Sequence, residues 1–247
     1  IIGFAISYLL LSYRRKKGLF DLPSQGAVQD MVFYGFVGLL IGGRLGACFL
    51  YAPLHYLTHP WEIIMTWKGG MASHGGFLGG MVGLYIFARR RKVPFIHLID
   101  NAALACTPGL FFGRIANFIN SELVGRVTTV PWAVIFPRID DQPRHPAQIY
   151  QAFTEGLLLF LILMWIGRRR RPDGVLSGAF AICYAIVRIV TERYRAVTPL
   201  LKGDEGVWLG LTKGQFYSIG LIFLGIFLLS RAYRFSRHSR PAKSPPQ

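Results

Sequence analysis

Polar side chains gather in residues 113–126 (GRIANFINSELVGR), directly after a long apolar run. An ionisable group is costly in hydrocarbon, so such a cluster at the end of an expected membrane helix indicates a functional site. Arg114 offers a planar fork of donors that suits a phosphate, and Asn117 at i+3 shares its face if the helix continues. Glu122 can pair with an arginine or accept a substrate hydroxyl. The alternative is that Arg114 extends to the outer interface and Glu122 caps it.

A candidate general base precedes this cluster in the chain. His74 stands in the sequence SHGG, at the start of an expected helix. Histidine titrates near neutrality and can take a proton from a nucleophile, and the adjoining glycines permit close approach of a ligand. The alternative is an interfacial histidine that caps the helix.

A third group of charges follows toward the carboxyl end. Glu192 and Arg195 lie at i+4 and i+7 from Arg188, so one helical face carries all three. An intramembrane pair of this kind either contacts substrate or holds helices together, and both interpretations stay open. The sequence Arg-His-Pro at 144–146 is typical of a helix start, because proline fits the first turn.

Several other chemistries find no support in the sequence. It contains no HExxH zinc motif, no GxSxG nucleophile motif and no Walker-type phosphate loop. Cys48, Cys106 and Cys183 lie in apolar segments without paired spacing, so we interpret them as small buried side chains. The sequence also has no acidic cluster that would clearly hold a divalent metal.

The composition indicates a polytopic membrane protein. Of 247 residues, 52% are hydrophobic, and the mean hydropathy is +0.38. The net charge of +16 comes largely from basic blocks at residues 14–17, 89–92 and 168–171 and in the tail after residue 230. Each block follows an apolar run, which is typical of positive-inside topology and attraction to anionic lipid rather than of nucleic-acid binding.

The apolar pattern predicts an all-α protein of about seven transmembrane helices with a small outer head region. The expected helices cover about residues 1–13, 28–51, 75–88, 95–112, 146–166, 175–194 and 214–229. At about 1.5 Å per residue the first is too short for about 30 Å of hydrocarbon, and we interpret it as the inner half of a longer helix. No basic segment precedes it, so a cleavable signal peptide is not expected.

The helix pattern also predicts the domain organisation. Residues 1–230 form a transmembrane catalytic domain with outer segments at about 52–72, 113–145 and 195–213. Residues 231–247 form a basic, Pro-rich cytoplasmic tail that we expect to be disordered. All four basic blocks then lie on one side, which predicts an outer amino terminus and a cytoplasmic carboxyl terminus. The remaining arginines fall mostly outside, where a phosphate-bearing ligand explains them.

Taken together, these motifs resemble those of bacterial prolipoprotein diacylglyceryl transferases. Residues 113–126 are similar to the family signature of Gly-Arg, then Gly-Asn-Phe-x-Asn, then Glu and Gly. Supporting stretches are GGRLG at 42–46, GGMASHGG at 69–76, RHPAQIYQ at 144–151 and the face from 188 to 195. The resemblance covers nearly the whole chain, and the seven-helix topology matches.

The resemblance implies an activity and its site. Diacylglyceryl would move from phosphatidylglycerol to the lipobox cysteine thiol of a preprolipoprotein signal peptide, in the bacterial cytoplasmic membrane, with release of glycerol phosphate. Arg114 and Arg188 would hold the lipid phosphate, and His74 would generate the thiolate. The substrate site would further include Asn117, Asn120, Glu122, Gly125, Arg144, His145, Glu192 and Arg195. The resemblance also implies that no metal or organic cofactor is required. We expect a monomer with no nucleic-acid partner.

Two departures from the family pattern stand out. Ala116 occupies a position that is usually glycine, and a His-Trp-Tyr-Gly-type segment of the family precedes the first residue of this sequence.

Two other functions remain as alternatives. An anionic-lipid carrier or flippase would use the same arginines without a base, and a structural membrane subunit would use the polar residues only to hold helices together.

Overall fold

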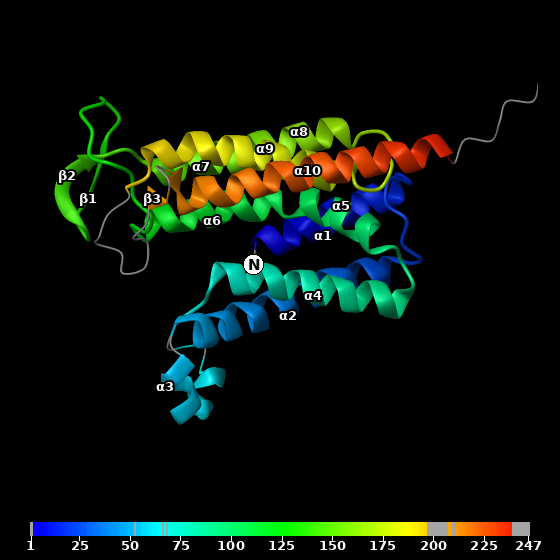
Figure 1. Cartoon of the computed structure of the whole chain (residues 1–247), viewed down its shortest axis with the longest axis horizontal. Coiled ribbons are helices and arrows are strands. Elements are labelled where there is room, and N and C mark those ends of the chain that lie inside the picture. Colours follow the sequence, from blue (N-terminus) through cyan, green and yellow to red (C-terminus); the bar gives the residue numbers. More distant parts are fainter. Residues whose placement is uncertain are drawn as a thin grey trace, which may run out of the picture. The chain divides into compact units, whose positions relative to one another are not determined.

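The computed structural model describes residues 2–51, 53–65, 67, 69–196, 207–208 and 211–238. These residues are mostly helical and belong to two compact units (Figure 1). The N-terminal unit is Tyr8–Ile99, and the C-terminal unit comprises Ile1–Ser7 and Asp100–Gln247. The predicted all-α class therefore holds for the described chain.

The N-terminal unit contains three longer helices and three short helical segments. Its elements are α1 (Ile2–Lys16, whose residues up to Ser7 belong to the other unit), α2 (Gln25–Gly46), a π-helical segment (Ala47–Tyr51), α3 (Pro53–Thr58), a 3-10 segment (Pro60–Ile64) and α4 (Ser73–Arg91). Ser24 caps α2, because its hydroxyl accepts the backbone N–H of Ala27 at 3.1 Å. Helix α4 ends in Arg89, Arg90 and Arg91, basic side chains that suit a helix carboxyl end.

Glycines bring the backbones of α2 and α4 together. A Cβ on Gly42 would stand 2.3 Å from the carbonyl oxygen of Gly75, and one on Gly79 would stand 2.1 Å from that of Gly38. Small residues permit such contact between membrane helices. Close packing of α2 against α4 therefore accounts for glycine at these positions.

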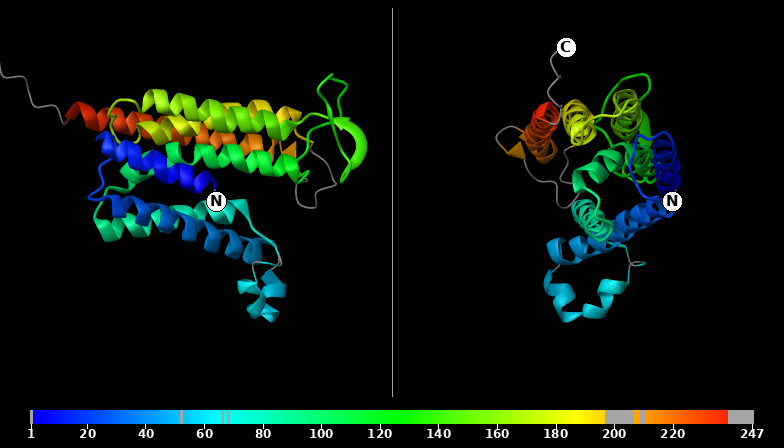
Figure 2. Two further views of the ribbon diagram at one scale, coloured as in Figure 1. Left: turned by 180° about the vertical axis from the view of Figure 1, so that it is seen from behind. Right: turned by 90° about the vertical axis from the view of Figure 1, so that its right-hand side faces the viewer.

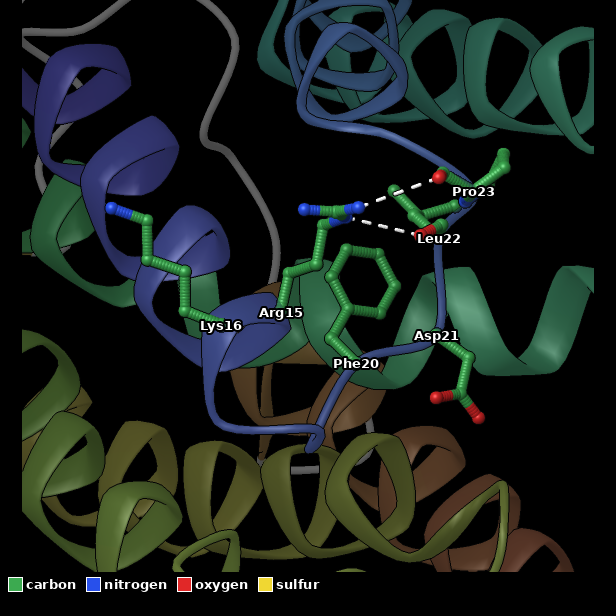
Figure 3. A pocket seen from close by; sticks show the side chains of 6 residues that line it. All are labelled: Arg15, Lys16, Phe20, Asp21, Leu22 and Pro23. Atoms are coloured by element: carbon green, nitrogen blue, oxygen red, sulfur yellow. Dashed lines mark hydrogen bonds between the residues drawn. The ribbon is translucent and has the colours of Figure 1, made fainter.

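A pocket of about 580 Å³ opens at the turn after α1 (Figure 3). Arg15 forms part of its wall, and its Nε donates to the carbonyl oxygen of Leu22 at 3.0 Å. The other lining residues are Lys16, Phe20, Asp21 and Pro23. The pocket adjoins the first basic block and contains none of the predicted site residues.

The C-terminal unit is a helical bundle with a small hairpin. Its elements are α5 (Phe95–Ala105, which begins in the other unit), α6 (Thr107–Ile119), β1 (Val134–Phe136), β2 (Asp140–Arg144), α7 (Ala147–Gln151), a π segment (Ala152–Leu158), α8 (Leu159–Ile166), α9 (Val175–Thr191), a 3-10 turn (Glu192–Tyr194), β3 (Val207–Trp208), β4 (Leu211–Thr212) and α10 (Lys213–His238). Helix α6 lies along α7 and its π segment, and α9 lies beside α10 (Figures 1 and 2). Strands β1 and β2 pair antiparallel, as do β3 and β4.

The start of α9 is fixed by a buried carboxylate. Asp100 on α5 accepts the backbone N–H groups of Gly174 and Ser177, each at 2.9 Å, and the hydroxyl of Ser177. A carboxylate at a helix amino end satisfies its unpaired N–H groups and complements the helix dipole. This contact sets the position of the helix that carries Arg188.

The structure supports a multi-pass membrane protein. Among the described residues, however, it shows fewer candidate membrane spans than the seven predicted. Four described helices are long and apolar enough to cross a membrane: Gln25–Phe49, Ala147–Ile166, Val175–Tyr194 and Gly214–Arg234. A fifth span is possible if α5 and α6, which meet at a 41° bend, count as one. Helix α1 has only 15 described residues, and the basic end of α4 lowers its apolar character.

Two helices extend past their predicted ends. Helix α6 continues to Ile119 rather than stopping near Phe112, and α10 continues to His238. No proline or glycine interrupts residues 114–119 or 231–238, so nothing in these stretches breaks a helix. Residues 231–238 are thus helical, which corrects the predicted disorder there. Residues 239–247 and most of the predicted outer segment 195–213 lie outside the described residues.

Candidate active site

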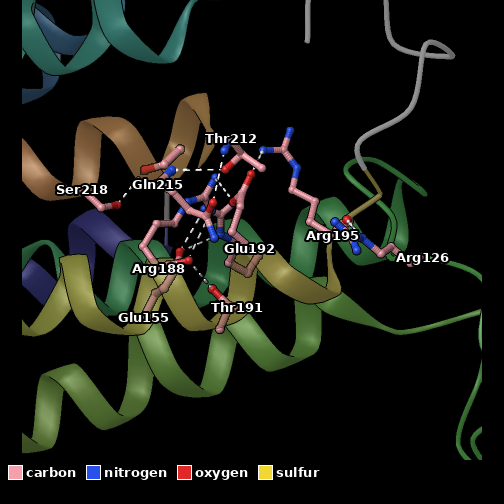
Figure 4. Close-up of polar contacts among 11 residues, drawn as sticks. Arg126, Glu155, Arg188, Thr191, Glu192, Arg195, Thr212, Gln215 and Ser218 are labelled. Atoms are coloured by element: carbon pink, nitrogen blue, oxygen red, sulfur yellow. Dashed lines mark hydrogen bonds and ion pairs between the residues drawn. The ribbon is translucent and has the colours of Figure 1, made fainter. Parts of the chain in front are cut away.

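A buried glutamate joins two helices of the C-terminal unit. Glu155 lies in the π segment after α7, and its side chain is fully buried. One carboxylate oxygen accepts Nη2 and Nε of Arg114 at 2.9 and 3.2 Å. The other accepts Nη1 of Arg188 at 3.3 Å (Figure 4). A single carboxylate therefore holds the arginines of α6 and α9 beside one another.

The ion pairs continue along α9 beyond Glu155. Arg188 Nη2 lies 3.1 Å from Glu192 Oε2, and Glu192 Oε1 lies 3.3 Å from Arg195 Nη1 (Figure 4). Together with Arg114 and Glu155, these ion-paired side chains comprise three guanidinium groups and two carboxylates, so the group carries one net positive charge. We call these five residues the arginine–glutamate cluster.

The cluster is well placed to attract an anion. The side chains of Arg114 and Arg188 are only 16% and 14% exposed, so water screens their charges weakly and Coulomb interactions are stronger than at the surface. Each guanidinium has five N–H donors, more than its carboxylate contacts use. The arrangement can hold a phosphate and stabilise negative charge that develops on it.

The π-helical turn at Glu155 is itself informative. A π segment inserts an extra residue into a helical turn, and such segments occur frequently at functional sites. Here it spans Ala152–Leu158, in the middle of the helix from Ala147 to Ile166. The widened turn carries the one carboxylate that both arginines share.

The predicted signature residues after Arg114 form a tight turn. Asn117 is on α6, and its side-chain amide donates to Glu122 at 2.6 Å. Ser121 and Leu123 both have positive φ, at 60° and 54°, a strained conformation for residues other than glycine. The described side-chain partner of Glu122 is thus Asn117 rather than an arginine. Asn120 is exposed at the end of α6.

Gly125 fits a position where any side chain would collide. It pairs with Arg195 in an isolated β-bridge, and a Cβ on it would stand 2.1 Å from the carbonyl oxygen of His145. The end of the signature is therefore held between the segment that follows α9 and the start of α7. This explains a glycine at this position in terms of backbone contact.

Arg144 and His145 organise the hairpin in this structure. Arg144 is buried, binds Asp140 in an ion pair and donates to the carbonyl oxygen of Gly125 at 3.2 Å. The hydrogen bond from Arg144 lowers the pKa of Asp140. His145 Nδ1 lies 3.2 Å from the hydroxyl of Tyr150. The described partners of both predicted binding residues are thus neighbouring protein groups.

The remaining predicted catalytic residue belongs to the N-terminal unit. His74 is exposed in the first turn of α4. The loop before it is held by buried Arg44 on α2, whose guanidinium donates to five backbone carbonyl oxygens among the described residues. Those oxygens belong to Glu62, Ile63, Met65, Gly69 and Gly70. Arg44 therefore holds this loop against α2, a structural role that the sequence did not predict.

Glu155 is the site residue that sequence reasoning missed. Its signal is present, because it is the only carboxylate between residues 142 and 172 and interrupts an expected membrane helix. A charge at such a position is a functional hypothesis by default. Within the described residues, no group of three or more His, Cys, Asp or Glu side chains could hold a metal.

Comparisons with known proteins find relatives that match most of this chain. A family model described as prolipoprotein diacylglyceryl transferase matches residues 1–231. The phosphatidylglycerol–prolipoprotein diacylglyceryl transferase of Nitrosospira multiformis is 43% identical over 239 residues, which are 95% of this chain and 80% of that protein. Its namesakes from Coxiella burnetii and Methylocella silvestris are 40% and 42% identical over 234 and 245 residues. These alignments cover 95% and 98% of this chain and 88% of each relative. The family match includes every candidate site residue.

Proposed function

Since the chain belongs to the prolipoprotein diacylglyceryl transferase family, we propose that its arginine–glutamate cluster holds the phosphate of phosphatidylglycerol during the transfer. The family's reaction is the first step of lipoprotein maturation, in which the diacylglyceryl group passes from phosphatidylglycerol to a prolipoprotein. The observation that carries the proposal is the shared carboxylate of Glu155, which holds Arg114 and Arg188 together.

The reaction assigns a charge change to this cluster. A thiolate of the acceptor cysteine attacks the glyceryl carbon that bears the phosphate oxygen. The carbon–sulfur bond forms as the carbon–oxygen bond breaks, and the bonding pair stays on the departing glycerol phosphate. The phosphate thereby changes from a diester with one negative charge to a monoester with two. Partly desolvated guanidinium groups stabilise this added charge more in the transition state than in the bound lipid.

The remaining predicted residues receive supporting roles in this proposal. Glu192 and Arg195 orient Arg188 through the ion pairs described above. Asn117, Asn120 and Glu122 shape the approach to the headgroup, and Gly125 lets the chain pass His145. Arg144 and His145 support this region through the hairpin.

The direct test uses the full-length protein in vesicles of phosphatidylglycerol with a lipobox peptide. Formation of the thioether and release of glycerol phosphate are the expected results. No release at all would refute the proposed reaction. Movement of lipid between leaflets without product would instead indicate a carrier.

Replacing either arginine by lysine is expected to reduce transfer about 10- to 100-fold, because one or more charge-assisted hydrogen bonds are lost while the charge stays. Arg114→Lys and Arg188→Lys are compared with Arg90→Lys, whose described partner is the hydroxyl of Tyr34 near the exposed end of α4. Initial rates at equal protein content are the measurement. Wild-type rates in both site variants would refute the phosphate role.

We further propose that His74 accepts the proton of the acceptor thiol. His74→Gln is expected to lower the rate about a hundredfold or more, the usual range for loss of a general base. Raising the pH above the ordinary thiol pKa of about 8.5 should restore part of that rate, because the thiolate then forms without a base. A folded variant with an undiminished rate at neutral pH, or one with no recovery at high pH, would remove this role.

The topology of the chain completes the proposal. Residues 1–230 are a membrane-embedded catalytic domain in the bacterial cytoplasmic membrane, and residues 231–247 lie in the cytoplasm. Four basic blocks, including Arg89–Arg91 at the end of α4, support a cytoplasmic side for those helix ends. The amino terminus is outside, and the enzyme works as a monomer on lipobox signal peptides. Labelling of single introduced cysteines with an impermeant thiol reagent checks the orientation.

A further inference from the structure

Three polar residues form a buried stripe on the helix that carries Glu155. Gln148, Gln151 and Glu155 follow one another at i, i+3 and i+7, a spacing that places them on one side of a helix. Gln148 and Glu155 are fully buried, and Gln151 is 1% exposed. Glutamine is mostly an exposed residue in proteins, so two fully buried glutamines beside the ionic cluster require an explanation.

Contacts at both ends show that this stripe faces α6 and the turn after it. At one end Glu155 binds Arg114 of α6. At the other end the Nε2 of Gln148 donates to the carbonyl oxygen of Glu122 at 2.7 Å. Gln151 lies between these two contacts. At about 1.5 Å per residue, it is about 6 Å along the helix from Glu155.

Within the part of the chain that the structure describes, the amide of Gln151 has no hydrogen-bond partner. Among the described residues, neither its nitrogen nor its oxygen makes a hydrogen bond, and the oxygen of Gln148 also lacks one. A buried polar group without a partner costs free energy, and most buried polar groups in proteins are paired. Gln151 can therefore offer a ligand its N–H donors and its side-chain oxygen, and Gln148 can offer its side-chain oxygen. Both residues lie beside the arginine–glutamate cluster.

We propose that Gln151, with the oxygen of Gln148, binds the hydroxyl groups of the donor lipid's glycerol headgroup. The inference rests on the proposed function, because it takes the phosphate to lie at Arg114 and Arg188. The headgroup glycerol is bonded directly to that phosphate and can reach a side chain about 6 Å farther along the helix. A hydroxyl both donates and accepts, as an uncharged amide does, whereas an ammonium headgroup only donates. Gln151 is thus a specificity-determining residue for a polyol headgroup.

The test compares two donor lipids with the same acyl chains, phosphatidylglycerol and phosphatidylpropanol. The second keeps the phosphodiester but lacks both headgroup hydroxyls. Wild-type kcat/KM should favour phosphatidylglycerol about tenfold, as one or two good hydrogen bonds allow. In Gln151→Met, kcat/KM for phosphatidylglycerol should fall about tenfold while that for phosphatidylpropanol stays unchanged.

A matched substitution and an internal ratio control the experiment. Gln25→Met removes a half-buried glutamine of the N-terminal unit, whose buried side-chain oxygen lacks a described partner, and should leave the donor preference unchanged. The ratio of the two donors is measured on one sample, so a smaller folded fraction does not alter it. The proposal is overturned if Gln151→Met keeps the wild-type ratio, impairs both donors equally, or changes only the KM of the acceptor peptide. Absence of transfer by the wild-type protein would refute the proposed function and the inference with it.

Discussion

Glu155→Gln is expected to lower diacylglyceryl transfer at least about a hundredfold, the scale of losing one preorganised electrostatic contact at a reacting group. The amide keeps the size of the side chain but removes its negative charge. Arg114 and Arg188 then repel one another across a site that is shielded from water, because their shared counter-charge is gone. The distance between the two guanidinium groups and the directions of their N–H donors then change. Both groups are proposed to contact the phosphate.

The same substitution should also destabilise the C-terminal unit. Removing one partner of a buried ion pair costs about 3–5 kcal/mol, because the remaining charges stay buried without compensation. Arg114 and Arg188 both lose the Glu155 carboxylate here, although Arg188 keeps its ion pair with Glu192. We therefore expect a lower melting temperature in detergent along with the loss of turnover. Bound phosphatidylglycerol should partly restore the melting temperature, since its phosphate replaces the missing negative charge.

A surface ion pair supplies the control. Asp30→Asn removes the carboxylate that pairs with Arg91, and both side chains are nearly half exposed. Exposed pairs contribute about 0–1 kcal/mol, so this variant should keep wild-type turnover and stability. Transfer rates and melting curves are measured for both variants at equal protein content. Equal rates for Glu155→Gln and the wild type would show that the cluster is not part of the reaction site.

Gly156→Ala is the second substitution with a large expected effect. A Cβ on Gly156 would stand 2.6 Å from the Cβ and 2.7 Å from the Cα of Phe111 on α6. Because backbone atoms cannot yield as a flexible side chain does, α6 and the π segment must separate. Overpacking of this kind costs about 1–3 kcal/mol. The separation also moves Arg114 away from Glu155, and a misplacement of about 1 Å can reduce a rate about a hundredfold.

The matched control is Gly220→Ala on α10, where an added Cβ meets no atom within 4 Å. Alanine favours a helix more than glycine does, by about 1 kcal/mol, so this variant should be at least as stable as the wild type. Rates and melting temperatures of the two variants are compared in the same detergent and lipid. If Gly156→Ala matched Gly220→Ala in both measurements, the close approach of α6 would have no part in positioning the cluster.

Much of this protein was predictable from residue type and short spacing. The apolar runs and basic blocks indicated an all-α membrane protein, and the signature at 113–126 indicated the family that the comparisons show. The face formed by Arg188, Glu192 and Arg195 was also predictable, and the structure pairs these residues. These features depend on helix periodicity and composition, which act over a few residues.

Contacts between distant segments required the tertiary structure. Glu155 is 41 residues from Arg114 and 33 from Arg188, so no helical spacing relates them. Only the packing of α6 and α9 against the π segment brings both arginines to one carboxylate. The need for glycine at 125 likewise arises from the backbone of His145, 20 residues along the chain. The sequence by itself determined which side chains carry charge and that apolar helices dominate the chain, whereas the fold decided which charges meet, because their pairing depends on how whole helices pack.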